Sequence, residues 1–188
     1  MKSNIDQVMD WVFVHEGGYA ERDSEPGGAV NMGISFTAYK DAWHQRNRAG
    51  EPTFADLKAM QRGNLDDEND LDAEDIYAMW FFKPIDFNVL PSGVDYALLD
   101  FAVNSGIGGS LRAIQKKWNF PVTGKMDAKL LWALKARDSK TVIGDICDAR
   151  LHLMQGSKKW ETFKSNWTRR LDKVRARCLA MAEKDIVS

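Results

Sequence analysis

Hydrophobic residues recur every three or four positions along most of this chain, the spacing of amphipathic helices. The first stripe runs from Ile5 to Phe13 and stops at Gly17. Further helices are predicted over residues 36–46, 53–61, 72–82, 94–104, 111–118, 127–137, 141–154 and 160–185. Residues 19–35 lack this spacing and are rich in glycine, which is typical of a loop or a tight turn. The pattern predicts a mainly α-helical fold with a small irregular loop or β-hairpin after the first helix.

The length of 188 residues suits one domain or two tightly joined lobes. Residues 84–93 are punctuated by proline and glycine and form the best candidate junction. We therefore expect one lobe over residues 1–90 and a second over 91–188, packed together as one unit.

Charge is distributed unevenly along the chain, although its net value is only −1. Residues 1–100 contain 19 acidic and 8 basic side chains, whereas residues 101–188 contain 8 acidic and 18 basic ones. A basic half is typical of proteins with a polyanionic partner, and attraction between the two halves explains it equally well. No helix-turn-helix signature accompanies the charge, so we do not expect a nucleic-acid partner.

Cysteine and histidine usage excludes several classes of protein. Two cysteines, Cys147 and Cys178, are too few for a disulfide scaffold and lack the paired spacing of a zinc site. The three histidines are scattered, so we expect neither a metal nor another cofactor. The first twenty residues contain Asp6 and Asp10 and resemble no signal peptide, which favours a cytosolic origin.

Glu16 is the first candidate for chemistry, because it ends the first predicted helix directly before Gly17. The negative end of the helix dipole and apolar neighbours such as Val12 and Phe13 are expected to raise the pKa of its carboxyl group. A raised pKa suits a general acid at neutral pH. The alternative is a solvated glutamate that merely ends a helix.

Glu25 is the second candidate, in an acidic loop nine residues further along. Pro26 and the two glycines after it form a turn that can bring the chain back across the helix end. A helix-end carboxylic acid that faces a loop carboxylate is the arrangement that glycoside hydrolysis uses. Solvated acidic loops are also common, so spacing alone leaves both interpretations open.

Several segments resemble glycoside hydrolase family 108, whose members are bacterial and phage muramidases that cut peptidoglycan. The resemblance is carried by residues 16–19 (EGGY) and 25–35 (EPGGAVNMGIS), and then by 81–84 (FFKP) and 100–106 (DFAVNSG). The tail, with Gln115 and the sequence VTGKMD at 122–127, resembles the peptidoglycan-binding region that follows the family's catalytic part. The resemblance implies a lysozyme-like helical fold.

The resemblance also implies roles for individual residues. Glu16 falls on the catalytic glutamate that protonates the glycosidic oxygen. Glu25 and Asn31 stand where related phage lysozymes have an Asp and a Thr, and Glu25 and Val30 depart from the family pattern. Glu25 is then expected to stabilise the transition state or activate water, and Asn31 to bind the substrate or water, or to fix the loop backbone. The expected substrate-binding residues are Tyr19, Ser35 and Asn104.

The expected function is that of a muramidase that hydrolyses the β-1,4 bond between N-acetylmuramic acid and N-acetylglucosamine. A phage endolysin fits this expectation, as a monomer that waits in the host cytoplasm until it is released to the periplasm and cell wall. The alternative is a non-catalytic cell-wall-binding or secretion-accessory protein.

The last predicted helix, from Lys158 to Lys184, is basic and amphipathic. Its apolar stripe consists of Trp160, Phe163, Trp167, Leu171 and Val174. Such a stripe is expected to pack into the core, and contact with anionic envelope surfaces is the second possibility.

Overall fold

The computed structural model describes residues 2–21, 27–63 and 71–187. The chain divides into two compact units, which we call the hairpin unit (Ile5–Trp80) and the helical unit (Met1–Asn4 with Phe81–Ser188). The lobes expected from sequence, 1–90 and 91–188, stay a prediction. None of the described helices combines the length and apolar character that crossing a membrane requires.

The hairpin unit combines short helices with a three-stranded antiparallel sheet of order β1-β2-β3. Its elements are α1 (Lys2–Glu16, which begins in the helical unit), β1 (Ala20–Glu21), β2 (Ala29–Asn31), β3 (Ile34–Ser35), α2 (Phe36–Gln45), α3 (Phe54–Ala59) and α4 (Ala73–Tyr77). Side-chain caps begin three of these helices: Ser35 caps α2, Thr53 caps α3 and Asp72 caps α4. The small sheet after the first helix confirms the expected β-hairpin.

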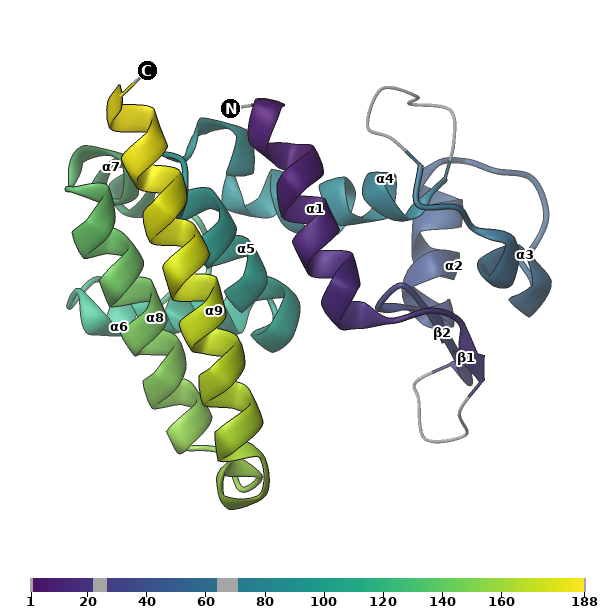
Figure 1. Cartoon of the computed structure of the whole chain (residues 1–188). Coiled ribbons are helices and arrows are strands. Elements are labelled where there is room, and N and C mark those ends of the chain that lie inside the picture. Colours follow the sequence, from purple (N-terminus) through teal and green to yellow (C-terminus); the bar gives the residue numbers. More distant parts are fainter. Residues whose placement is uncertain (1, 22–26, 64–70, 188) are drawn as a thin grey trace. The chain divides into compact units, whose positions relative to one another are not determined.

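The helical unit is built around one buried helix, α5. Its elements are η1 (Ala78–Phe82, which begins in the hairpin unit), η2 (Lys83–Ile85), η3 (Phe87–Val89), α5 (Val94–Ser105), α6 (Ile107–Lys117), α7 (Ala128–Ala136), α8 (Ser139–Gln155) and α9 (Trp160–Val187). Residues 94–102 of α5 are all buried, and α6, α8 and α9 pack around them. Figure 1 shows α8 and α9 side by side as a long antiparallel pair. The described structure confirms the mainly helical, lysozyme-like fold expected from the sequence.

A buried ion pair network joins three helices of this unit. Asp100 of α5 is fully buried and binds Arg150 of α8, while Arg170 of α9 reaches its other oxygen at 2.9 Å. Burial alone would raise the pKa of Asp100, but the two guanidinium groups outweigh this effect and hold its pKa below the usual value. The network therefore fixes the relative placement of α5, α8 and α9.

Ser92 joins two further parts of the helical unit that are far apart in sequence. Its Oγ accepts a hydrogen bond from Asn4 Nδ2 at 2.8 Å and donates one to the carbonyl of Met181 at 3.5 Å. The first turn of α1 and the last turns of α9 therefore both lie against Ser92.

Two predicted helices differ in detail from the observed ones. The helix expected over residues 72–82 is α-helical only to Tyr77 and continues as the π-helix η1. The helix expected to begin at Leu111 begins earlier, at Ile107. The break between α5 and α6 lies at Gly106, which has φ of +74°, and the two glycines that follow Ile107 belong to the first turn of α6.

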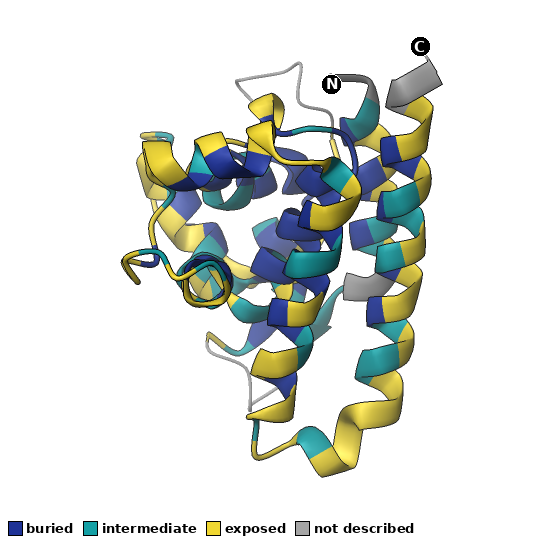
Figure 2. Ribbon diagram, turned by 90° about the vertical axis from the view of Figure 1, so that its left-hand side faces the viewer, coloured by how far each residue is buried: buried dark blue, intermediate teal, exposed yellow. Residues whose placement is uncertain are grey.

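The expected core stripe of α9 is correct only in its second half. Leu171 and Val174 are buried, but Phe163 is 40% exposed. Figure 2 shows that the end where α8 meets α9 is largely exposed. Near it, Phe163 stacks on Trp167 with ring centroids 5.7 Å apart, and Trp160 lies 6.4 Å from Trp167. Packing of Phe163 into the core is therefore a wrong expectation, since its side chain remains exposed.

Candidate active site

The backbone places Glu16 as the last residue of α1. Gly17 follows with φ of +75°, the left-handed conformation that ends helices and that glycine adopts without strain. This agrees with the sequence-based end of the first helix. The side chain of Glu16 and the whole of Glu25 lie outside the described residues.

The last turns of α1 are anchored within the hairpin unit. Val12 is fully buried, and the ring of Phe13 meets Tyr77 of α4 edge-on, with centroids 5.3 Å apart. The guanidinium of Arg62 lies 5.4 Å from the centre of the Phe13 ring and also pairs with Asp10 of α1. These contacts hold the backbone that carries Glu16.

Arg62 binds α4 as well as α1. Its Nε donates to Glu74 Oε1 at 2.7 Å, and Glu74 is buried. Burial raises the pKa of Glu74, and the adjacent Arg62 only partly offsets this effect. Arg62 therefore links the two helices by charge as well as by packing.

The strands β2 and β3 form a tight hairpin with a two-residue turn. Asn31 pairs with Ile34, and Met32 and Gly33 between them have φ of +48° and +76°. Two successive positive φ values are the mark of a type I′ turn, which matches the twist of antiparallel strands. The glycine of the NMGIS sequence is thus required by the turn.

Two side chains from the neighbouring helices fix this hairpin. Asn31 is buried and its Nδ2 donates to the carbonyl of Leu57 in α3 at 2.8 Å. The hydroxyl of Tyr77 donates to the carbonyl of Met32 at 3.2 Å. Since Tyr77 also packs against Phe13, one residue of α4 contacts both the hairpin and the helix that ends at Glu16.

The glycines before the hairpin allow close packing. A Cβ on Gly27 would come within 2.7 Å of Thr37 Oγ1, and one on Gly28 would lie 3.3 Å from the ring of Phe54. Both glycines also have positive φ. Glycine at positions 27 and 28 is therefore explained by a loop that packs closely against α2 and α3.

The expected substrate-binding residues lie in both units. Tyr19 is partly exposed, and its hydroxyl donates to Glu21 Oε1 at 2.6 Å, which raises the pKa of Tyr19 because the bond needs the neutral phenol. Ser35 accepts a hydrogen bond from the N–H of Ala38, as the cap of α2. Asn104 is exposed near the end of α5.

These observations leave the expected roles open. Asn31 makes the backbone contact that was one of its two expected functions. Its part in catalysis, and substrate binding by Tyr19, Ser35 and Asn104, stay predictions. Among the described residues, no group of three histidine, cysteine or acidic side chains is arranged to hold a metal ion.

Sequence reasoning did not identify Tyr77 or Arg62 as residues that support the site. Tyr77 lies in a helical segment among other apolar residues, and Arg62 follows a short helix without any motif. Their importance comes from contacts across long sequence separations, which hydrophobic spacing does not show.

Known proteins provide a family and a structural relative. Residues 9–106 match the family model described as Glycosyl hydrolase 108. The structure of SagA from Brucella abortus is similar, with a TM-score of 0.76 and 33% sequence identity over 97% of each chain. No curated protein matches the chain.

Proposed function

Because the chain belongs to the glycosyl hydrolase 108 family, we propose that it is an N-acetylmuramidase that hydrolyses peptidoglycan. The bond proposed to be cut is the β-1,4 linkage between N-acetylmuramic acid and N-acetylglucosamine. The main support is the position of Glu16: it lies within the matched segment and ends α1, and Tyr77 contacts both α1 and the hairpin.

Glu16 is proposed to act as the general acid. A carboxyl group at the C-terminal end of a helix faces the negative end of the dipole, which favours the protonated form. In that form it can donate its proton to the oxygen of the leaving sugar. Glu25 is proposed to stabilise the positively charged transition state or to activate the attacking water, and Asn31 to orient water or substrate.

The proposal is tested by replacing Glu16 with glutamine, which keeps the size of the side chain and removes its acidic proton. Release of reducing sugar from purified peptidoglycan should be abolished, while the circular dichroism spectrum stays unchanged. Glu51→Gln is the matched control, since Glu51 is an exposed glutamate of the same unit. Full activity in Glu16→Gln would refute the assignment. Wild-type protein that sediments with the wall without releasing reducing ends would instead support the non-catalytic alternative.

The cleaved bond is tested by mass spectrometry of the digested wall after borohydride reduction. A muramidase leaves reduced N-acetylmuramic acid at the new ends. Reduced N-acetylglucosamine would show a glucosaminidase, and separation of peptides from intact glycan strands would show an amidase. Either result would overturn the proposed specificity.

The biological setting is also a proposal. The resemblance to phage muramidases supports an endolysin that stays in the host cytoplasm until the inner membrane is opened. Expression alone should then leave cells intact, and permeabilising the membrane should cause lysis. Secretion to the periplasm without membrane damage would contradict this role.

Two partner expectations belong to the same proposal. The protein is expected to elute as a monomer, which light scattering after size exclusion tests. Contact between α9 and anionic envelope surfaces would appear as salt-sensitive sedimentation with vesicles that contain anionic lipid, through Phe163 and its basic neighbours.

A further inference from the structure

A cavity of about 730 Å³ lies between α6 and α8 in the helical unit. Its apolar lining includes Ala113 and Leu153, and the latter side chain is 42% exposed. Three cations, Arg112, Lys116 and Lys117, also line it. A cavity lined by both apolar and positively charged side chains suits an organic anion.

One carboxylate, that of Asp148, lines the same cavity, but its negative charge is already balanced by neighbouring cations. Arg175 donates to Asp148 at 2.6 Å, and Lys117 lies 3.5 Å from its other oxygen. The hydrogen bond from Arg175 holds the pKa of Asp148 below its usual value. Asp148 therefore stays ionised and paired, and it does not exclude an anion from the cavity.

The other two cations have no such partner. No carboxylate in the part of the chain that the structure describes pairs with Arg112 or Lys116, and both side chains are exposed. Their charge is therefore available to a ligand. A guanidinium can bind a carboxylate through two parallel hydrogen bonds, with an ammonium nearby as a second charge.

The loop after α6 is held against Arg112 by a buried glutamine. Gln115 Nε2 donates to Thr123 Oγ1 at 2.9 Å and to the carbonyl of Lys125 at 3.0 Å, and its Oε1 accepts from the N–H of Gly124 at 2.8 Å. Gly124 has φ of +70°, and a Cβ there would lie 2.6 Å from Arg112 Nη1. The sequence VTGKMD thus forms a fixed wall beside the guanidinium.

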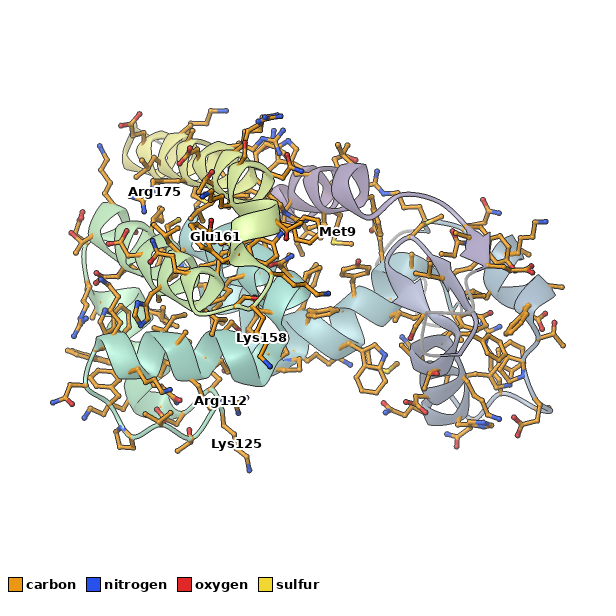
Figure 3. All side chains as sticks on the ribbon, turned by 90° about the horizontal axis from the view of Figure 1, so that it is seen from below. Met9, Arg112, Lys125, Lys158, Glu161 and Arg175 are labelled. Carbon is orange, nitrogen blue, oxygen red and sulfur yellow. The ribbon has the colours of Figure 1, made fainter. Side chains whose placement is uncertain are left out.

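Two more lysines flank this region. Lys125 follows Gly124 in the wall, and Lys158 is two residues beyond Gly156, which lines the cavity. Figure 3 shows Arg112, Lys125 and Lys158 in one part of the view. The cations that line the cavity itself belong to α6, and Lys125 and Lys158 lie on segments next to it along the chain.

We propose that this cavity binds the acidic stem peptide of peptidoglycan, through the carboxylates of the peptide. The proposal rests on the proposed function, which makes this polymer the substrate. The cavity is far larger than a single inorganic anion needs and lies within the usual range for small-molecule sites, about 300–1,000 Å³. Stem peptides combine free carboxylates with short aliphatic groups, and Arg112, Lys116 and the Ala113 and Leu153 side chains complement both.

Calorimetry on the full chain tests the proposal with the free tetrapeptide stem as probe, in the Glu16→Gln background. The double variant Arg112→Ala/Lys116→Ala should bind the peptide about tenfold more weakly or worse, since it loses two charge-assisted contacts. The matched control is Lys135→Ala/Arg169→Ala, which removes the same charge from exposed positions away from the cavity lining. Its affinity should change by less than about twofold. Lys116→Glu alone should also weaken binding, with an unchanged circular dichroism spectrum.

Two further probes identify the chemistry that is recognised. A tetrapeptide with amidated carboxyl groups should bind far more weakly, and inorganic phosphate should not compete at the same concentration. Equal binding of the amidated peptide, equal loss in both double variants, or full competition by phosphate would each overturn the proposal. Peptide binding without hydrolysis of peptidoglycan would refute only the proposed function, and hydrolysis without peptide binding would refute only this inference.

Discussion

Asp100 lies in a segment that resembles a family block, but its described contacts are structural. Replacing it with asparagine would leave Arg150 buried without its counter-charge, which typically costs about 3–5 kcal/mol. We expect Asp100→Asn to lower the free energy of unfolding by this amount in urea titrations. Asp172→Asn, at an exposed position of α9, should change it by less than about 0.5 kcal/mol. Equal stability of the two variants would contradict a structural role for the network.

The same network predicts a dependence on pH. The pKa of Asp100 is lower in the folded protein than in the unfolded chain, so its ionised form stabilises the fold. This contribution is complete above the unfolded value of about 4 and is lost as the pH falls through the folded value. The difference in stability between wild type and Asp100→Asn should therefore be constant near neutrality and shrink in acid. A difference that grows on acidification would show the opposite shift.

Removing the hydroxyl group of Tyr77 tests whether this residue positions the hairpin of the candidate active site. Tyr77→Phe keeps the ring against Phe13 and removes the hydrogen bond to Met32, a loss of about 1 kcal/mol in stability. If that bond positions the hairpin for catalysis, kcat should fall several-fold on soluble glycan while KM changes little. Tyr39→Phe is the control, because the Tyr39 hydroxyl makes no hydrogen bond to any described residue. Identical kinetics in both variants would remove Tyr77 from the positioning of the site.

At the scale of single elements, glycine has opposite effects in a turn and in a helix. Gly33→Ala places a side chain at φ of +76° and should cost about 1–2 kcal/mol. Gly144→Ala lies within α8, where an added Cβ meets no atom within 4 Å, and should stabilise by up to about 1 kcal/mol. Thermal unfolding of the two variants should therefore shift in opposite directions. An unchanged or higher melting temperature for Gly33→Ala would contradict this assignment of the turn, and a lower one for Gly144→Ala would contradict the expected gain in α8.

Most helices could be predicted from the sequence, because each buries an apolar stripe that repeats at helical spacing. The side chains of Ser35, Thr53 and Asp127 cap three of these helices, at α2, α3 and α7. Two details could not be predicted: the π-helix at Ala78–Phe82 and the exposed end of α9. Both depend on which surfaces other helices cover, and hydrophobic spacing carries no information about that.

The candidate site could be predicted in part. The string from Glu16 to Ser35 indicated the family and the place where α1 ends. Two roles were expected for Asn31, because an asparagine side chain can bind either the backbone or a substrate. Its buried hydrogen bond to Leu57 is the backbone contact of these two. The basic cavity beside Arg112 was not predicted, since its lining comes from α6 and α8, which only the fold brings together.

At the scale of the whole molecule, two buried cysteines report on the integrity of the helical unit. Cys147 of α8 and Cys178 of α9 are both reduced and buried, and burial raises the pKa of each thiol. Neither should react with Ellman's reagent under native conditions, and both should react once denaturant separates the helices. A cysteine introduced at the exposed position Lys135 should react at once. Rapid native labelling of the natural thiols would show that α8 and α9 open easily.

The hydrogen bonds of Ser92 with Asn4 and Met181 have a consequence for protein engineering. They place the first turn of α1 and the last turns of α9 against the same residue, so a short glycine linker could join the start of α1 to the end of α9. New termini could then be opened at the exposed connection between α8 and α9, where few contacts would be lost. Such a circular permutant would carry affinity tags or fusion partners at the opposite end of these helices.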